Sequence, residues 1–85
     1  MALNIAYFAW VRERMGIADE TIDVPAGIAD VGALVAWLAA RDAQGKIAFA
    51  EPHRIRAAID GVMMGPDAPL SGAKEVALFP PVTGG

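Results

Sequence analysis

One amphipathic segment limits the folds that are open to this chain of 85 residues. Downstream of Asp30, apolar side chains recur at the spacing of one helical face, and the positions are Val31, Leu34, Val35 and Leu38. Asp30 is suited to cap the first turn, Arg41 suits the helix dipole near the end, and Gly45 is placed to terminate the helix. The sequence therefore predicts one main helix with a single apolar stripe.

Before this helix, residues 3–7 and 21–24 alternate between apolar and polar positions, as half-buried strands do, and short apolar runs follow the helix. The predicted strands are residues 3–8, 21–24, 55–59, 62–64 and 75–79. Asp60-Gly61 indicates a tight hairpin between two of them, because such a turn needs positive φ angles. Residues 12–16 are interpreted as a loop or short turn, and residues 46–54 as a loop with at most one turn of structure.

The order strand, strand, helix, then three strands predicts an α+β domain. One helix would pack across a mixed sheet of four to five strands, which is the β-grasp architecture of ubiquitin-like proteins. Residues 1–79 are expected to form this domain, and residues 80–85 to form an extended tail. A chain of this size has room for one modest core and for no deep cleft of its own.

The tail carries the strongest indication of function. Its residues are Pro80, Pro81, Val82, Thr83, Gly84 and Gly85. The two prolines favour an extended backbone, and the two glycines remove every side chain before the carboxylate. Such an arm suits a narrow tunnel in another protein, with Val82 as its one apolar anchor. A frayed terminus is the ordinary alternative, but a terminal Gly-Gly arises by chance in only about 0.5% of chains.

Composition excludes several classes of partner. The net charge is −3 and the seven Lys and Arg residues are dispersed, which argues against nucleic acids and anionic membranes. The chain has no cysteine, so it has no disulfide, thiolate nucleophile or zinc-thiolate site, as suits a reducing cytoplasm. We expect no signal peptide and no membrane span, since no stretch approaches ~18 apolar residues.

No cluster of residues predicts catalysis or metal binding by this chain alone. His53 is the only histidine, and it is interpreted as solvated or structural. Asp19, Glu20 and Asp23 are interpreted as a solvated strand face and not as a metal site.

The two ends of the chain resemble one protein family. The ending EVALFPPVTGG resembles the tail of the small subunit of molybdopterin synthase, the MoaD family of sulfur carriers. Tyr7-Phe8-Ala9, Val11-Arg12-Glu13 and Gly16 resemble that family's N-terminal segment, and the order of elements between the ends agrees. The chain departs from the family pattern at Asp60-Gly61 and at Ala73-Lys74-Glu75, which bears on interface detail.

The resemblance implies a chemistry for Gly85. An α-carboxylate is ionised at neutral pH and is a poor electrophile, so it has to be activated. By resemblance, a ubiquitin-activating-type adenylyltransferase uses ATP to form an acyl-adenylate on Gly85, and a sulfur donor converts it to a thiocarboxylate. The tail then enters the large subunit and donates sulfur to a cyclic pyranopterin precursor, and two transfers build the dithiolene that binds molybdenum. The chain would bind no cofactor stably and would not be an enzyme alone.

The resemblance also implies partner surfaces. Phe8, Met63 and Phe79 match positions that face the large subunit, Arg12 matches a position that contacts the activating enzyme, and the complex would hold two small and two large subunits. Three alternatives share the fold: a sulfur carrier for thiamin synthesis or tRNA thiolation, a ubiquitin-like modifier, and a passive adaptor. The Phe-Pro-Pro-Val element favours the pterin pathway over the other sulfur-carrier pathways.

Overall fold

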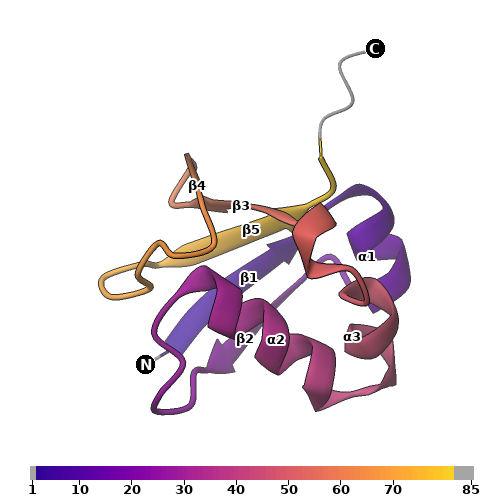
Figure 1. Cartoon of the computed structure of the whole chain (residues 1–85), viewed down its shortest axis with the longest axis horizontal. Coiled ribbons are helices and arrows are strands. Elements are labelled where there is room, and N and C mark those ends of the chain that lie inside the picture. Colours follow the sequence, from indigo (N-terminus) through magenta and orange to yellow (C-terminus); the bar gives the residue numbers. More distant parts are fainter. Residues whose placement is uncertain (1, 82–85) are drawn as a thin grey trace.

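The structure, a computed structural model, describes residues 2–81 and consists of one mixed sheet with helices against it (Figure 1). The elements are β1 (Ala2–Tyr7), α1 (Ala9–Met15), β2 (Asp19–Asp23), α2 (Val31–Arg41), α3 (Ala43–Ala48), the 3-10 helix η1 (Pro52–Arg54), β3 (Arg56–Ile59), β4 (Val62–Met64) and β5 (Glu75–Phe79).

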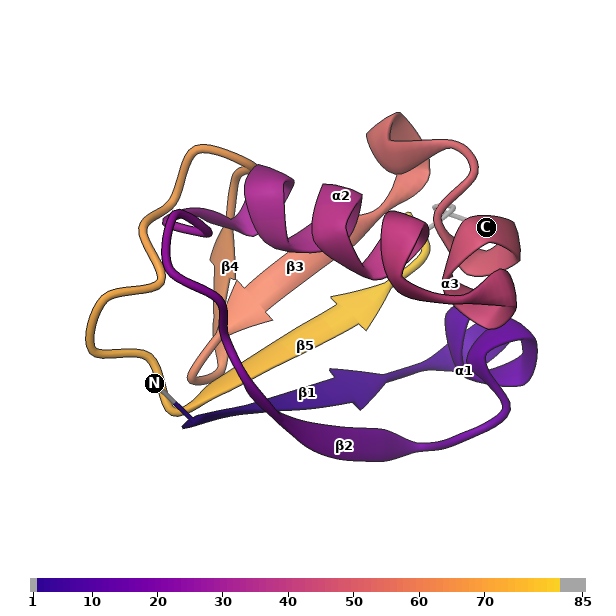
Figure 2. The same ribbon diagram turned by 90° about the horizontal axis from the view of Figure 1, so that it is seen from below.

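The strand order in the sheet is β2-β1-β5-β3-β4. The central strands β1 and β5 are parallel, and the other neighbouring strands are antiparallel. Helix α2 crosses one face of the sheet, and α1 and α3 lie towards the end at which β1 and β5 finish (Figure 2). The predicted β-grasp architecture with one main helix across a mixed sheet is confirmed.

The core lies between α2 and the helix-facing side of the two central strands. Every second residue of β1 and β5 is buried, as the period of a strand requires. These side chains pack with the predicted stripe of α2, all of which is buried, and the set includes Leu3, Ile5, Tyr7, Val76, Leu78, Leu34 and Leu38.

The start of α2 is held by one side chain and by a distant loop. The Asp30 carboxylate accepts a hydrogen bond from the Ala33 amide at 2.8 Å, which confirms the predicted N-cap. The amides of Val31 and Gly32 donate to the carbonyl oxygens of Ala68 and Pro66, at 3.1 and 2.7 Å. These bonds satisfy helix donors that have no partner within the helix, and they fasten the loop after β4 to α2.

The prediction of a loop at residues 12–16 is wrong, because α1 spans Ala9–Met15. Val11 and Met15 lie four residues apart and are the two buried residues of the helix. Two buried residues are too few for a visible period in the sequence, and a helix this short depends on tertiary packing. Gly16 ends it with a φ of 79°, which a glycine adopts without steric cost.

The predicted end of the main helix at Gly45 is also wrong. Helix α2 stops at Arg41, and Asp42 then caps a second helix, α3, by accepting from the Gly45 amide at 2.7 Å. Gly45 is buried inside α3, where a Cβ would collide with the carbonyl oxygen of Leu38. The glycine thus permits close contact between two helices, and Phe49 at the end of α3 is buried beside Tyr7 with ring centroids 6.3 Å apart.

The hairpin predicted at Asp60-Gly61 is confirmed. Both residues have positive φ, 48° and 86°, and they join β3 to β4. The Asp60 carboxylate also accepts from the amides of Lys74 and Glu75 at 3.1 and 2.9 Å. The turn residue therefore fixes the start of β5.

Glu20 does not belong to a solvated strand face, contrary to the prediction. It pairs with Ile5 in the sheet and so points towards the helices. Its carboxylate accepts two hydrogen bonds from the Arg41 guanidinium, at 2.9 and 2.7 Å, and one from the Tyr7 hydroxyl at 2.6 Å. The network joins the end of β1 and the start of β2 to the end of α2, and the hydrogen bonds from Arg41 lower the pKa of Glu20.

Gly45→Ala is expected to destabilise the domain by about 1–3 kcal/mol, because the added methyl group collides with backbone that cannot move freely. Urea unfolding of the variant measures the loss. Gly65→Ala is the matched control, because a Cβ there meets only the side chain of Asp67, at 3.2 Å. Equal stability of both variants would show that α2 and α3 do not pack as described.

The stability contributed by Glu20 is expected to depend on pH. Its pKa is lowered by folding, so the contribution is complete above the ordinary value of 4.5 and is lost as pH falls through and below that value. Glu20→Gln should cost about 1–3 kcal/mol at pH 7 and distinctly less at pH 3. Urea unfolding at both pH values tests this, with the exposed Glu13→Gln as control. The same cost at pH 3 and pH 7 would contradict it.

Candidate functional site

The end of the sheet at which β1 and β5 finish is the candidate site. Because the two strands are parallel, the start of α1 and the start of the tail lie at the same end. Phe8 continues β1 in an extended conformation, and its amide donates to the Leu78 carbonyl oxygen at 3.1 Å. The Phe8 carbonyl oxygen accepts from the amides of Val11 and Arg12 and so begins α1. Phe8 is thus fixed next to the end of β5.

The sheet face away from α2 carries mostly small side chains in its middle. Across four strands, one row runs Met63, Ala58, Ala77 and Ala6. In the next row Arg56 pairs with Phe79, and alternation places Phe8 on the same face. We name Phe8, Ala58, Met63, Ala77 and Phe79 the open-face patch.

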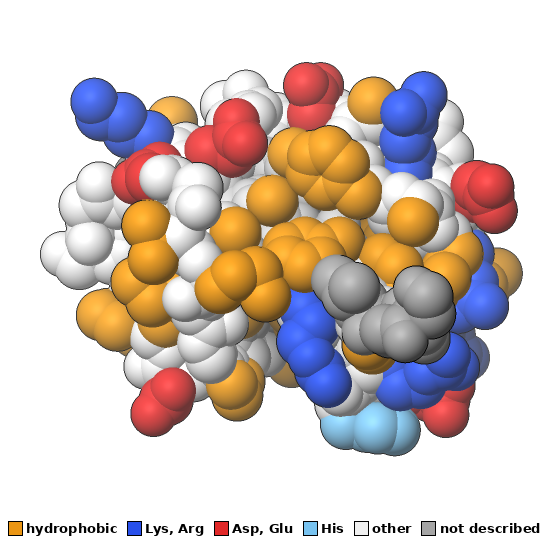
Figure 3. Space-filling model, turned by 90° about the horizontal axis from the view of Figure 1, so that it is seen from above, with side chains coloured by type: hydrophobic (Ala, Val, Ile, Leu, Met, Phe, Trp, Pro, Cys, Tyr) orange, Lys and Arg blue, Asp and Glu red, His pale blue; other side chains and the backbone are white. Residues whose placement is uncertain are grey.

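The open-face patch is exposed where its side chains are large. Phe8 is 49% exposed and Met63 is 60% exposed, while Phe79 is partly buried. Figure 3 shows hydrophobic side chains gathered in the middle of this face. A contiguous exposed apolar area of this kind is typical of a surface that binds another molecule, such as a protein partner. Its exposure shows that Phe8 is not an ordinary core residue.

The predicted tail begins beside this patch. Pro80 and Pro81 follow Phe79 directly and are both partly exposed. Val82, Thr83, Gly84 and Gly85 lie outside the described residues, so the expectations for them, including the extended course of the tail, stay predictions.

Arginines lie at the same end of the molecule. Arg14 and Arg54 both lie over the ring of Trp10, 4.2 and 5.6 Å from its centroid, which ties η1 to α1. Arg12 is exposed on α1, next to a shallow hollow that it shares with Gly16. Four of the seven Lys and Arg residues, Arg12, Arg14, Arg54 and Arg56, belong to α1 and to residues 54–56.

The structure brings some of the predicted site residues together. Phe8, directly after β1, lies next to the end of β5 at Phe79, and Met63 lies on the same face but is separated from β5 by β3. Arg12 lies on α1, at the tail end of the sheet and away from Met63. Sequence reasoning missed Ala58 and Ala77, although their alternation with buried Ala57 and Leu78 would have placed them on the open face.

The described residues form no evident metal site. Within residues 2–81, no three His, Cys, Asp or Glu side chains lie in an arrangement that could hold a metal ion. His53 is exposed in η1. The part of the chain that the structure describes has no helix long and apolar enough to cross a membrane.

Comparison with known proteins gives consistent results. The profile of the ThiS family matches residues 5–85. The molybdopterin synthase sulfur carrier subunit of Escherichia coli K12 is 36% identical over 83 residues, which cover 98% of this chain and 99% of that protein.

Two solved structures share the fold. One is described as a putative molybdopterin converting factor, subunit 1, from Pyrococcus furiosus; it has a TM-score of 0.72 and 26% identity, covering 96% of this chain and 99% of that one. SAMP1 of Haloferax volcanii has a TM-score of 0.72 and 24% identity, with both chains covered completely.

Proposed function

The chain belongs to the ThiS family, and from this membership we propose that it is the sulfur-carrier small subunit of a molybdopterin synthase. The observation that carries the proposal is the 36% identity, over nearly the full length of both chains, to a relative that bears this name. The ending Phe79-Pro80-Pro81-Val82-Thr83-Gly84-Gly85 supports it, because it supplies a thin arm with a carboxylate at its tip.

The proposed chemistry takes place at Gly85. The carboxylate oxygen attacks the α-phosphorus of ATP in a ubiquitin-activating-type enzyme, and pyrophosphate leaves. Sulfide delivered by a sulfur donor attacks the acyl carbon of the acyl-adenylate, AMP leaves, and a thiocarboxylate remains. The thiocarboxylate sulfur attacks cyclic pyranopterin monophosphate in the large subunit, which supplies the pocket and the acid–base groups. Water then cleaves the acyl–sulfur bond, so that the sulfur stays on the pterin and the Gly85 carboxylate is restored. In this scheme the small subunit acts in the cytoplasm and holds no cofactor of its own.

The open-face patch is proposed to bind the large subunit, in a complex of two small and two large chains. The position of the patch supports this, since the patch includes Phe79, the residue directly before the tail. A partner that receives the tail in a tunnel therefore meets Phe8 and Met63 next to the tunnel entrance. Arg12, on α1 at the same end, is proposed to contact the activating enzyme.

The intact mass of the chain tests the proposal. After incubation with its activating enzyme, ATP and a sulfur donor, the chain should gain the mass difference of one oxygen-to-sulfur exchange. Ladders of conjugates to other proteins would indicate a modifier instead. An unchanged mass would indicate an adaptor, and either outcome would overturn the proposal.

Deletion of Gly85 is expected to abolish sulfur transfer and to leave the fold intact, because the described core ends at Leu78. Replacement of Gly84 by Phe should have the same effect, since a Cβ and a ring would not fit a tunnel shaped for glycine. Dithiolene formation with the activating enzyme and the large subunit measures activity, and a circular dichroism melt measures the fold. Normal product from the deleted chain would refute the role of Gly85.

Met63→Asp is expected to weaken binding to the large subunit by more than ~2 kcal/mol, because it places a charge within the apolar binding patch. The melting temperature should change little, since the Met63 side chain is 60% exposed. Met64→Asp is the matched control, because this neighbour points to the opposite face of β4. Calorimetry that gives equal affinities for Met63→Asp and the unmodified chain would show that another face binds.

A further inference from the structure

A second apolar surface lies on the opposite side of β4 from Met63. It is a groove of about 420 Å³ between α2 and the pair β3–β4. Its apolar walls include Val31 and Val35 of α2, Ile55 and Ala57 at the start of β3, and Met64 of β4. Volumes of this size, with apolar walls and a few polar groups, are typical of sites that bind a ligand or several side chains.

One end of the groove is closed by backbone. Gly32 and Pro66 both line it, and the Gly32 amide donates to the Pro66 carbonyl oxygen at 2.7 Å. The absence of a side chain at Gly32 allows this approach, because a Cβ there would lie 3.2 Å from the same oxygen. The loop is held a second time by the bond from the Leu70 amide to the Ala29 carbonyl oxygen at 2.9 Å. The groove is therefore formed before any partner binds.

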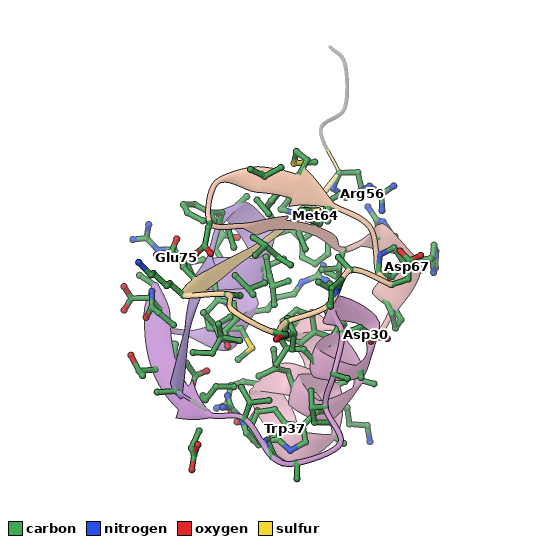
Figure 4. All side chains as sticks on the ribbon, turned by 90° about the vertical axis from the view of Figure 1, so that its left-hand side faces the viewer. Asp30, Trp37, Arg56, Met64, Asp67 and Glu75 are labelled. Carbon is green, nitrogen blue, oxygen red and sulfur yellow. The ribbon has the colours of Figure 1, made fainter. Side chains whose placement is uncertain are left out.

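The other end carries positive charge. His53 and Arg56 line this end, and an Arg56 Nη1 donates to the His53 carbonyl oxygen at 2.8 Å, which holds the guanidinium beside η1. Within residues 2–81, Arg56 makes no ion pair with a carboxylate. Figure 4 shows Arg56, Met64 and Asp67 on the part of the molecule where β3, β4 and the following loop meet. Among the residues that line the groove, Arg56 therefore supplies a positive charge, and the Asp67 carboxylate lies outside that lining.

The margin of the groove is an edge strand. β4 is the last strand of the sheet, and all three of its residues are exposed and apolar. An edge strand offers backbone donors and acceptors to an extended segment of another chain. Such a segment places alternate side chains on the two faces of the sheet, so one set would enter the groove beside Met64.

We propose that this groove binds an extended peptide segment of a partner protein, with apolar side chains between α2 and Met64 and an acidic side chain at His53 and Arg56. The positive charge of Arg56 favours an acidic residue in the peptide, and the exposed edge of β4 favours an extended conformation. The segment enters with its apolar part towards Gly32 and Pro66. This surface meets the open-face patch at Arg56, which pairs with Phe79 and also lines the groove. Met64 and the α2 residues of the groove lie on the helix side of the sheet, so the occupant of the groove does not depend on the proposed sulfur chemistry.

A pair of labelled peptides tests the proposal. The probe is a fluorescein-labelled decapeptide that alternates valine and threonine and ends in two aspartates, and its control replaces both aspartates by lysine. The ¹⁵N-labelled full chain is titrated with each peptide and followed by two-dimensional NMR. The acidic peptide should shift the amides of residues 31–35, 53–57 and 64–66, and should bind at least about tenfold more tightly than the lysine peptide.

Two variants separate the contributions of charge and shape. Arg56→Glu should weaken the acidic peptide at least about tenfold, whereas Arg12→Glu, the same reversal outside the groove, should not. Met64→Asp should weaken it, and Met63→Asp on the opposite face should not. Shifts confined to the open-face patch, equal binding of both peptides, or no saturable shift at ~1 mM peptide would each overturn the proposal. None of these outcomes bears on thiocarboxylate formation at Gly85.

Discussion

The parallel pairing of β1 with β5 determines the rest of this structure. It joins the first strand of the chain to the last in the centre of the sheet, with Ile5 opposite Val76 and Tyr7 opposite Leu78. A parallel pair has both carboxyl ends on the same side, so the chain leaves β1 into α1 at the point where the tail leaves β5. Phe8 and Phe79 become neighbours for that reason, and α1 begins next to the end of β5.

The sheet separates stability from recognition by strand alternation. One set of side chains on β1, β5 and β3 packs beneath α2, and the opposite set is small in the middle and leaves a flat apolar surface around Ala58 and Ala77. At β4 the helix no longer covers the sheet, so both faces of that strand are exposed. Met63 and Met64 therefore belong to two different surfaces, although they are adjacent in the chain.

The elements that could be predicted from the sequence are those whose causes are local. The four apolar positions of α2, its cap at Asp30 and the Asp60-Gly61 turn each follow from a few neighbouring residues. Helices α1 and α3 could not be predicted in this way, because each has only two buried residues and depends on packing against distant parts of the chain. Gly45 shows the difference, since a residue typical of a helix end serves here as a contact point between two helices.

The residues of the candidate site also differ in whether the sequence predicts them. Phe8, Met63, Phe79 and the tail were predicted because the two ends of the chain resemble a family whose partners are known. The groove and the role of Glu20 could not be predicted, because the groove combines residues 31–35, 52–57 and 64–66, and Glu20 meets Arg41 only in the folded chain. Periodicity predicts which face of a helix or strand a residue occupies, but it does not predict which distant segment that residue contacts.

The bond between Asp60 and the start of β5 has a consequence for how the chain can change in length. Its carboxylate holds the amides of Lys74 and Glu75, while Leu70 is held by Ala29. The turn at Ser71–Gly72 therefore lies between two points that are anchored independently, and both of its residues are exposed. Extra residues there would add only about 0.6 kcal/mol of loop entropy for each doubling of loop length. Insertions in this turn should therefore leave the register of β5 unchanged, and with it the position at which the tail begins.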